Sequence, residues 1–360
     1  MISPTPKRSL WPAKDPRAVV VLDQTRLPHR VQTVTLRSLD DVARAISDMT
    51  VRGAPLIGVT AAYGMAFAMA MDPSNASLAR AYDVLFATRP TAVNLRWALD
   101  VMRDLLAPLP PALRHEAALR KAHEVAEDDV SSNLALGLHG IQLLQQVAAR
   151  RNGQPVRIMT HCNAGRLAAV AWGTATAPIY LAHDNGIPVH VWVSETRPRN
   201  QGASLTAWEL ADHGVPHTVF ADNAAGHLLQ RGLVDLVIVG ADRVTRRGDV
   251  ANKIGTYLKA LAAKAHRVPF HVAFPCSTLD WTLDDGVASI PIEERSAREV
   301  THVSGTDPRG RVVTVRVAPM ESPARNDAFD VTPAKLVTGF ITERGLCAAN
   351  ARGLRALRRA

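Results

Sequence analysis

The sequence predicts an α/β protein in which a mostly helical N-terminal domain precedes a domain built on a largely parallel sheet. Helical spacing of apolar residues dominates as far as about residue 150. Beyond the turn at Arg151–Pro155, short β-rich runs alternate with Ala- and Leu-rich stretches of helical length, which is typical of βαβ units. With 360 residues, 47% of them hydrophobic, the chain is long enough to form two cores. We therefore expect domains at 1–150 and 151–345, followed by a basic tail at 346–360.

The first domain is expected to open with a short β-hairpin at residues 18–36 and to continue as helices. Ser38 is suited to cap the next helix, and Asp40 and Asp41 place negative charge in its first turn. Residues 53–71 carry no charge and approach the length of a membrane span. They are rich in Ala, Gly, Thr and Met, so we expect a buried helix of a globular domain rather than a membrane segment.

The second domain contains β-rich runs separated by stretches of helical length. They lie at 156–160, 189–194, 217–221, 236–240 and 269–274. In an open parallel sheet, ligands bind beyond the carboxyl ends of the strands. The loops that follow these runs are therefore the places to look for functional residues.

The net charge of +9 is concentrated at the two ends of the chain. Residues 1–30 hold six Lys or Arg against two acids, and residues 344–360 hold five Arg and no acid. Residues 31–343 are therefore formally neutral. A nucleic-acid enzyme would carry positive charge over its folded body, so we expect no nucleic-acid partner.

Three cysteines, Cys162, Cys276 and Cys347, lie far apart in the sequence. They predict neither a disulfide framework nor a zinc ribbon, and a reducing compartment fits them best. The first sixteen residues contain no apolar segment that could serve as a signal peptide. We expect a cytoplasmic protein with no membrane partner.

The first candidate loop is THCNAG, Thr160–Gly165, directly after a predicted strand. A cysteine between a strand and a helix lies among free backbone N–H groups at the positive end of the helix dipole, and both lower a thiol pKa. Cys162 is thus either an activated thiol or a small buried side chain. His161 beside it is expected to be structural.

Groups suited to a phosphate occur in three further segments. SETRPRNQGA, residues 194–203, offers two Arg, a Gln and a Gly, although the same residues are ordinary in a surface turn. Arg52, Gly53 and Ala54 stand before a proline that suits the first turn of a helix, so their N–H groups would point outward beside a cation. Arg89 is another cation, in a Pro-rich loop.

Asp242 follows the apolar run at 236–240 and is open to three interpretations: a helix cap, a ribose-binding acid or a catalytic acid. In a partly closed apolar cleft its pKa can rise enough for it to act as an acid at neutral pH. We expect a helix to begin at Asn252–Lys253, where Lys253 would oppose that rise and attract an anion. The stretch between them, Arg243–Ala251, is interpreted as a lid.

Several nucleotide, metal and nucleophile motifs do not occur in the sequence. There is no G-x-G-x-x-G, G-x-x-x-x-G-K-[ST], H-E-x-x-H or G-x-S-x-G. The first of these absences weakens the ribose-binding interpretation of Asp242. We expect neither a cofactor nor a metal.

Seven segments together resemble the methylthioribose-1-phosphate isomerase family, which also includes ribose-1,5-bisphosphate isomerases and the regulatory subunits of the translation-initiation guanine-nucleotide exchange factor. They run in order from about residue 51 to 345, and HCNAG followed by ETRP favours the isomerase branch. The segments are VRGAPLIGVTAAYG (51–64), RPTAVNL (89–95), HCNAG (161–165), ETRPRNQGASLTAWEL (195–210), VGADRVTRRGDVANKIGTY (239–257), IPIEER (290–295) and FDVTPAKLVTGFITERG (329–345).

The resemblance implies a Rossmann-like C-terminal domain, a homodimer, and Cys162 and Asp242 as the catalytic pair. It also implies substrate-binding positions at Arg52, Gly53, Ala54, Arg89, Gln201, Asn252 and Lys253. One residue departs from the pattern: the family usually has Arg where this chain has Ser204. The departure bears on local hydrogen bonding and on substrate preference.

The implied activity is the cofactor-free isomerisation of 5-methylthioribose 1-phosphate to 5-methylthioribulose 1-phosphate in methionine salvage. Because a phosphate on C1 locks the sugar as an acetal, the enzyme must open the ring before hydrogen moves from C2 to C1. We expect Asp242 to protonate the ring oxygen and Cys162 to assist hydrogen transfer. The alternatives are isomerisation of 5-deoxyribose 1-phosphate or ribose 1,5-bisphosphate, or a non-catalytic sugar- or nucleotide-phosphate sensor on the same fold.

Overall fold

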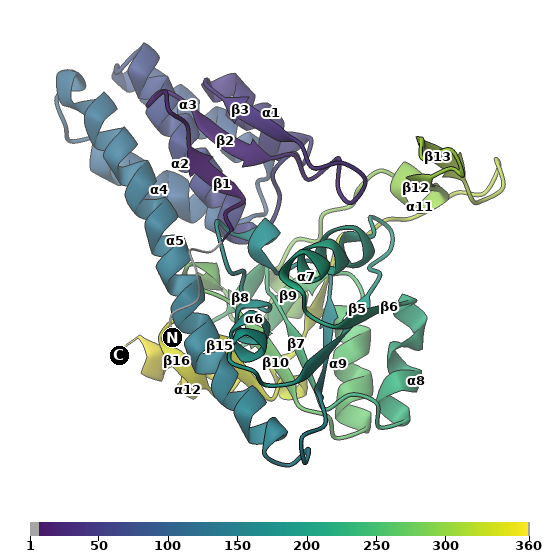
Figure 1. Cartoon of the computed structure of the whole chain (residues 1–360). Helices are drawn as coiled ribbons and strands as arrows, with labels where there is room; N and C mark the ends of the chain where they lie inside the picture. The colour runs from purple at the N-terminus through teal and green to yellow at the C-terminus, as the bar shows by residue number, and fades with distance from the viewer. Residues whose placement is uncertain (1–6, 359–360) are drawn as a thin grey trace.

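The N-terminal part pairs a small antiparallel sheet with a group of helices (Figure 1). The computed structural model describes residues 7–358. The sheet has the order β1-β2-β3, so the expected hairpin is confirmed and gains a third strand. Its strands and the helices after it are β1 (Leu10–Pro12), β2 (Val19–Leu22), β3 (Thr33–Leu36), α1 (Leu39–Ser47), α2 (Ala54–Met71), α3 (Asn75–Thr88) and α4 (Val93–Leu106). Ser38 caps α1 as predicted, because its hydroxyl accepts a hydrogen bond from the Asp41 N–H at 3.1 Å.

Helix α2 is the centre of the first core. By length and composition it is apolar enough to cross a membrane, but 83% of it is buried inside the protein. It packs against α1, α3 and α4 and against the long helix α5. The prediction of a buried helix at 53–71 is confirmed.

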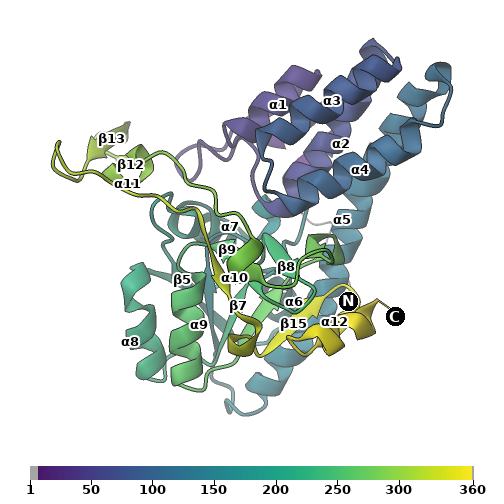
Figure 2. The same cartoon turned by 180° about the vertical axis from the view of Figure 1, so that it is seen from behind.

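Helix α5 (Pro111–Ala148) runs from the helical part to the large sheet, as both views show (Figures 1 and 2). Ala118, Ala122 and Val125 in its first half belong to the core around α2. Leu136 and Leu144 in its second half belong to the core on one face of the large sheet. One helix therefore packs into both cores and ties the two parts together.

The C-terminal part is built on a seven-stranded sheet with the order β16-β15-β10-β7-β4-β5-β6, in which only the β15–β16 pair is antiparallel. The predicted parallel sheet is therefore confirmed, and the five predicted strands correspond to β4, β5, β6, β7 and β10. The strands are β4 (Val156–His161), β5 (Val189–Ser194), β6 (His217–Phe220), β7 (Leu236–Val239), β10 (Phe270–Ala273), β15 (Gly339–Thr342) and β16 (Gly345–Cys347).

Helices cover both faces of this sheet because alternate strand residues point to opposite sides. Ile158 and Ile238 face the core that holds α5 and α6 (Ala177–Asp184). Met159 and Val237 face the core that holds α8 (Ala225–Gln230) and α9 (Thr256–Ala265). A π-helical turn at Gly202–Thr206 leads into α7 (Ala207–His213), beyond the carboxyl end of β5.

A second sheet overturns the expectation of a helix at Asn252–Lys253. These residues lie in β9, where they are paired with Asp330 and Phe329 of β14. The local sequence could not reveal this, because the partner strand is more than seventy residues away in the chain. Helix α9 begins only at Thr256, after Gly255 has turned the backbone with φ 97°.

The expected lid at Arg243–Ala251 is also corrected. It is a hairpin of this second sheet, whose order is β11-β8-β9-β14. The guanidinium of Arg243 donates to the carbonyl oxygen of Thr91 at 2.6 Å and fixes the hairpin to the helical part. The strands are β8 (Arg243–Thr245), β9 (Val250–Lys253), β11 (Leu279–Asp280) and β14 (Phe329–Thr332).

Residues between β11 and β14 extend outward as an arm that stands away from the body in both views (Figures 1 and 2). Its hairpin exposes valines, with 49% of Val312, 54% of Val315 and 59% of Val317 accessible. The arm carries α11 (Arg298–Thr301), β12 (His302–Thr306) and β13 (Val312–Arg316), whereas α10 (Gly286–Ser289) packs against β14 in the body.

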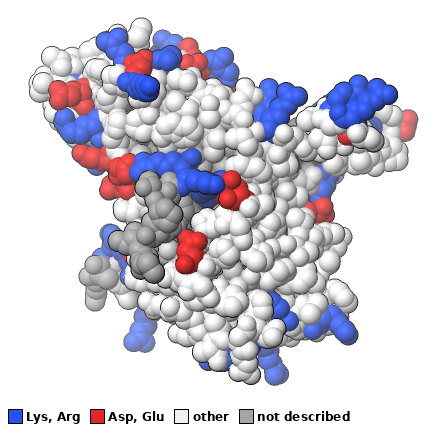
Figure 3. Space-filling view, in the orientation of Figure 1, with Lys and Arg blue, Asp and Glu red and all other residues white. Residues whose placement is uncertain are grey.

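The end of the described chain is folded. Strand β16 pairs with β15, and α12 (Ala351–Leu357) buries Leu354 and Leu357 in the core shared with α8 and α9. Its arginines at 352, 355 and 358 stay exposed. On the face seen in Figure 3, Lys and Arg side chains lie among Asp and Glu side chains and wide uncharged areas.

Because Leu354 is fully buried, Leu354→Ala should lower the free energy of unfolding by about 2–5 kcal/mol through lost burial and the cavity left behind. Urea unfolding followed by circular dichroism measures this. Arg352→Ala, on the exposed side of the same helix, is the control and should change stability little. Equal effects of the two substitutions would contradict the packing of α12 described here.

Candidate active site

Charged and reactive side chains from both parts of the chain meet beyond the carboxyl ends of β4 and β7. Cys162 follows β4 directly, and Asp242 lies three residues after β7. Arg52 and Arg89 come from the helical part and Lys253 comes from β9. Arg52, Asp242 and Lys253 all shift the pKa of Cys162, and Arg52, Cys162 and Asp242 all shift the pKa of Lys253, so the four groups lie close together. The structure thus brings together five of the residues that the sequence suggested.

Cys162 is held in a left-handed backbone conformation, with φ 62°, which is uncommon outside glycine. Its N–H donates to the Thr196 hydroxyl at 2.8 Å, and its carbonyl oxygen accepts from the Thr206 hydroxyl at 2.6 Å. Thr196 belongs to the loop after β5, and Thr206 to the π-helical turn. Side chains from the neighbouring loop therefore impose the unusual conformation of the cysteine.

Of the two interpretations left open for Cys162, the surroundings favour a buried, uncharged thiol over an activated thiolate. Burial raises the pKa of the Cys162 thiol, and the nearby cations Arg52 and Lys253 oppose this only in part. No α-helix begins at the cysteine, since only a short 3₁₀ turn at Arg166–Ala168 follows and α6 starts at Ala177. The helix dipole that would have lowered the pKa is therefore missing at this position.

Asp242 lies between β7 and β8, so it does not cap a helix. Its N–H donates to the carbonyl oxygen of Ala251 at 2.9 Å, which fixes it at the base of the β8–β9 hairpin. Burial raises the pKa of its carboxyl group, and the negative charge of Glu293 adds to the rise. Lys253, Arg52 and Arg89 oppose it. A raised pKa for Asp242 agrees with the expectation from its cleft-like surroundings.

Lys253 and Asn252 are adjacent but differ in their surroundings. The Lys253 ammonium lies 4.4 Å from the ring centroid of Phe329, and burial lowers its pKa while Cys162 and Asp242 raise it. The Asn252 amide donates to the Thr256 hydroxyl at 3.0 Å. Strand alternation turns it to the face opposite Lys253. The structure therefore places the Asn252 side chain at the base of α9. It does not belong to the charged group of the site, by which we mean Arg52, Arg89, Cys162, Asp242 and Lys253.

Gly53 and Ala54 begin α2 as expected, with Gly53 as the N-cap residue at φ 98°. A Cβ atom on Gly53 would lie 2.3 Å from the Cα of Ala168. Only glycine therefore allows the start of α2 to approach the loop after β4. Next to it, the guanidinium of Arg52 donates to the side-chain oxygen of Asn163 at 2.5 Å and to its carbonyl oxygen at 2.9 Å.

Arg89 has an acidic partner that the sequence analysis did not single out. Its guanidinium lies 3.2 Å from the Glu293 carboxylate, and Arg295 donates to the same carboxylate at 2.8 Å. Glu293 belongs to the segment IPIEER, but nothing in its local sequence distinguishes it from neighbouring acids. The role of Glu293 becomes visible only in the folded chain, where its segment lies beside Arg89.

Gln201 and Ser204 line a cavity of about 530 Å³ next to Arg52. The cavity lies between the helical part, the π-helical turn and the arm, and Met49 and Leu205 contribute apolar walls. The side-chain oxygen of Gln201 is buried and finds no hydrogen-bond partner within residues 7–358. With Ser204 in place of a longer side chain, this cavity stays open beside the charged group.

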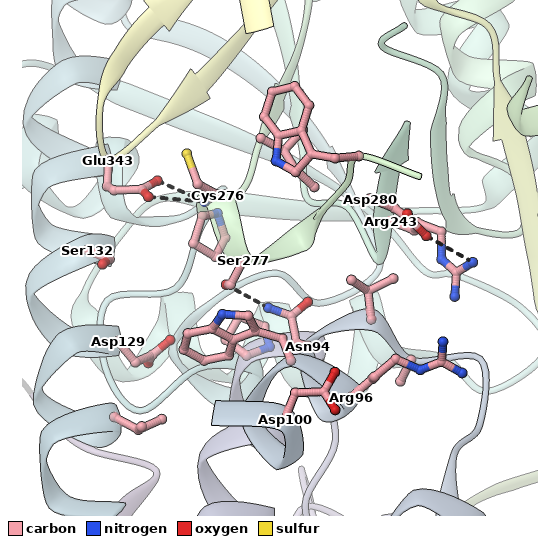
Figure 4. Close-up of a pocket in the computed structure, with 18 of the residues that line it drawn as sticks. Asn94, Arg96, Asp100, Asp129, Ser132, Arg243, Cys276, Ser277, Asp280 and Glu343 are labelled. Carbon is pink, nitrogen blue, oxygen red and sulfur yellow. Dashed lines mark hydrogen bonds and ion pairs between the residues drawn. The ribbon is translucent and has the colours of Figure 1, made fainter. Parts of the chain in front are cut away.

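A larger cavity of about 920 Å³ lies between α4, α5 and α12 (Figure 4). Its polar groups largely satisfy one another: Asn94 donates to Ser277 at 2.9 Å, and the Cys276 N–H donates to Glu343 at 3.0 Å. Cys162, Asp242 and Lys253 do not line it. We assign the site to the place where Cys162, Asp242 and Lys253 meet cations from the helical part, and not to this larger cavity.

His161 is structural, as expected. It is fully buried, and its Nε2 donates to the carbonyl oxygen of Ile254 at 2.8 Å. Burial lowers its pKa to about 3, so the ring is neutral at physiological pH. In the described part of the chain, no three His, Cys, Asp or Glu side chains are grouped so as to hold a metal ion.

In a Cys276→Ser/Cys347→Ser protein, Cys162 should give no thiolate absorbance in the ultraviolet at neutral pH, because burial favours the uncharged thiol. The absorbance should appear only well into the alkaline range. The same protein with Cys162→Ser supplies the baseline. A thiolate signal at neutral pH would contradict the assignment of a neutral thiol.

Comparisons with known proteins identify the family of the chain. Residues 50–349 match the Initiation factor 2 subunit family. The chain is 60% identical over 350 residues to the methylthioribose-1-phosphate isomerase of Rhizobium meliloti (strain 1021), covering 97% of this chain and 96% of the relative. It is 61% identical over 356 residues to that of Cereibacter sphaeroides (strain KD131 / KCTC 12085), covering 99% and 97%.

Two solved structures have the same fold. The 5-methylthioribose 1-phosphate isomerase from Pyrococcus horikoshii OT3 has a TM-score of 0.83 at 38% identity and covers 98% of this chain and 96% of its own. The translation initiation factor eIF-2B subunit delta from A. fulgidus has a TM-score of 0.79 at 36% identity, covering 98% and 99%. The chain therefore belongs to the Initiation factor 2 subunit family, among its methylthioribose-1-phosphate isomerases.

Proposed function

We propose that this protein isomerises 5-methylthioribose 1-phosphate to 5-methylthioribulose 1-phosphate in methionine salvage, without a cofactor. The relatives near 60% identity carry the name of this activity. The observation that carries the proposal is the meeting of an acid with a raised pKa, a neutral thiol and several half-buried cations at one point. These are groups that a phosphorylated sugar needs for binding and for proton transfer.

Ring opening is the step assigned to Asp242. The substrate is an acetal, so its C1–O ring bond breaks only if the ring oxygen gains a proton. Because burial raises the pKa of Asp242, its carboxyl group holds a proton for this purpose at higher pH than an ordinary aspartic acid. Once it has given up that proton, the carboxylate can accept one from C2 or from the C2 hydroxyl during hydrogen transfer.

Hydrogen transfer from C2 to C1 is assigned to the neighbourhood of Cys162. In a proton route, C2 loses a proton to leave a phosphoenol, and C1 is then protonated. In a hydride route, hydrogen moves from C2 to C1 with its electron pair. In the first route the Asp242 carboxylate would take the proton from C2, and the Cys162 thiol would donate its proton to C1 and then regain one from the C2 hydroxyl. Arg52 and Lys253 both lower the pKa of the thiol and so favour its donation. Deuterium from solvent at C1 of the product would exclude the pure hydride route.

The phosphate is assigned to the cationic side of the site. Arg52, the N–H groups of Gly53 and Ala54, and Lys253 would hold it, because guanidinium groups and helix N-termini favour phosphate oxygens. Arg89 and Gln201 would complete the substrate contacts. Asn252 would contribute through its backbone, since its side chain is bonded to Thr256.

A second candidate is a non-catalytic sensor of sugar or nucleotide phosphates. The 36% identity to a solved eIF-2B subunit delta supports keeping it. A sensor needs the cations but neither the acid nor the thiol. Turnover by the purified protein therefore separates the two candidates.

Purified protein should convert methylthioribose 1-phosphate faster than 5-deoxyribose 1-phosphate or ribose 1,5-bisphosphate. Asp242→Asn should lower kcat by about 10²- to 10⁴-fold, because the variant has no proton to donate to the ring oxygen. Product formation followed by phosphorus NMR measures both. Full turnover by Asp242→Asn would remove the role assigned to this residue, and no turnover of any of the three by the unmodified protein would favour the sensor.

Stability provides the control for Asp242→Asn. The folded protein raises the pKa of Asp242 above its unfolded value, so its contribution to stability is lost as the pH rises through that range. The asparagine variant carries no such penalty and should unfold at a higher temperature than the unmodified protein at neutral pH. The difference should vanish below the pKa of an ordinary aspartic acid.

We infer that the protein is a cytoplasmic homodimer. The resemblance to the isomerase family supports this, and the exposed valines of β13 offer apolar surface that a second copy could cover. Light scattering during size-exclusion chromatography should give twice the mass of the chain. A mass equal to one chain would contradict the inference.

A further inference from the structure

A carboxylate without an assigned role, Glu209 of α7, lies beneath the loop that carries Cys162. It is fully buried. One of its oxygens accepts from the Asn163 amide at 2.8 Å, and the other accepts from the Leu167 N–H at 3.2 Å. A Cβ atom on Gly165 would collide with the carboxylate, 1.5 Å away. The loop from Asn163 to Leu167 is thus folded directly over Glu209.

Asn163 connects this carboxylate to Arg52. Its side-chain oxygen and its carbonyl oxygen both accept hydrogen bonds from the Arg52 guanidinium, at 2.5 and 2.9 Å. A carboxylate can only accept hydrogen bonds, so Glu209 requires the NH₂ end of the Asn163 amide on its side. The oxygen end must then face Arg52. Glu209 therefore decides which way the amide points.

The same amide connects to Cys162. Its NH₂ group also donates to the Thr206 hydroxyl at 3.1 Å. That hydroxyl gives its single proton to the carbonyl oxygen of Cys162 at 2.6 Å. Asn163 and Thr206 are both buried, so water does not compete for these bonds.

We propose that Glu209 is a positioning residue that, through Asn163, orients the Arg52 guanidinium and holds the Cys162 backbone for the isomerisation. This rests on the function proposed above. Glu209 does not touch the substrate. Its effect reaches the site through a network of bonds that is buried and offers no alternative partner for the amide.

Charged and titratable groups face Glu209 from each side. They are Arg166 from the 3₁₀ turn, Arg52 from the helical part and Tyr180 from α6. Burial raises the pKa of Glu209 to about 7, while Arg166, the Leu167 N–H and Asn163 oppose the rise. A protonated Glu209 would direct its O–H at the Asn163 amide or the Leu167 N–H, which are themselves donors. Activity should therefore fall as the pH falls through about 7.

Glu209→Gln should lower kcat/KM by about 10-fold or more. The NH₂ end of the new amide would face either the Asn163 NH₂ group or the Leu167 N–H, and both of these are donors. It should also shift the acid limb of the pH profile of kcat/KM to lower pH, since Glu209 no longer titrates near 7. In an Arg52→Ala protein the same substitution should have a much smaller effect, because Glu209 would have lost the group it positions.

Asp129→Asn is the matched control. Burial raises the pKa of Asp129 to about 7 as well, and it bonds to the Val170 N–H at 2.7 Å, outside the charged group. This variant should keep the acid limb of the unmodified protein. Asn163→Ala is a second test with Glu209 left intact, and it should lower kcat/KM to a similar extent.

Binding of inorganic phosphate, measured by calorimetry, separates failure of this proposal from failure of the proposed function. Glu209→Gln and Asn163→Ala should weaken phosphate binding several-fold, and Asp129→Asn should not. If the unmodified protein binds phosphate but turns over none of the sugars, the isomerase assignment fails while the weakened binding upholds the positioning role. Unchanged phosphate affinity in Glu209→Gln, or an acid limb at the same pH as in the unmodified protein, would overturn the positioning role whatever the turnover.

Discussion

The site depends on keeping charges of both signs away from water at the junction of two differently built parts. Arg52 and Arg89 come from the helical part, Asp242 and Lys253 from the second sheet, and Glu293 from the base of the arm. Each of these groups would be strongly solvated alone. Burial becomes tolerable only where opposite charges lie close by. The fold must therefore bring all three parts together before any one of them can hold its charges.

The fold brings these parts together partly by close approach of their backbones. The start of α2 fits against Ala168 because Gly53 has no side chain. Helix α5 contributes to both cores and fixes the helical part to the sheet, and Arg243 fastens the β8–β9 hairpin to the same part. The left-handed conformation of Cys162 is unfavourable by itself, yet Thr196 and Thr206 hold it by bonds to both its N–H and its carbonyl oxygen. The junction thus imposes a geometry that the local sequence would not adopt alone.

Much of the fold could be predicted because it follows from local patterns. The alternation of strands and helices predicted the parallel sheet, and Ser38 and the uncharged stretch at 53–71 predicted a capped helix and a buried one. Asn252 and Lys253 were misread because their strand partner, β14, is far away in sequence. Glu293, Asn163 and Glu209 escaped notice for the same reason: each is an ordinary polar residue until distant segments surround it. The sequence left two interpretations of Cys162 open, and the activated thiolate loses support because the following segment does not form the α-helix whose dipole it required.

The pKa shifts also decide which kind of chemistry the site favours. A buried site that contained only cations would ionise both its acid and its thiol. Here burial outweighs the cations at Asp242 and at Cys162, so both reactive groups hold their protons to higher pH than an ordinary aspartic acid or cysteine. A phosphate dianion entering among Arg52, Arg89 and Lys253 would offset their positive charge and strengthen that preference further. The acid that must protonate the ring oxygen is therefore kept ready by burial, and substrate binding itself increases its readiness.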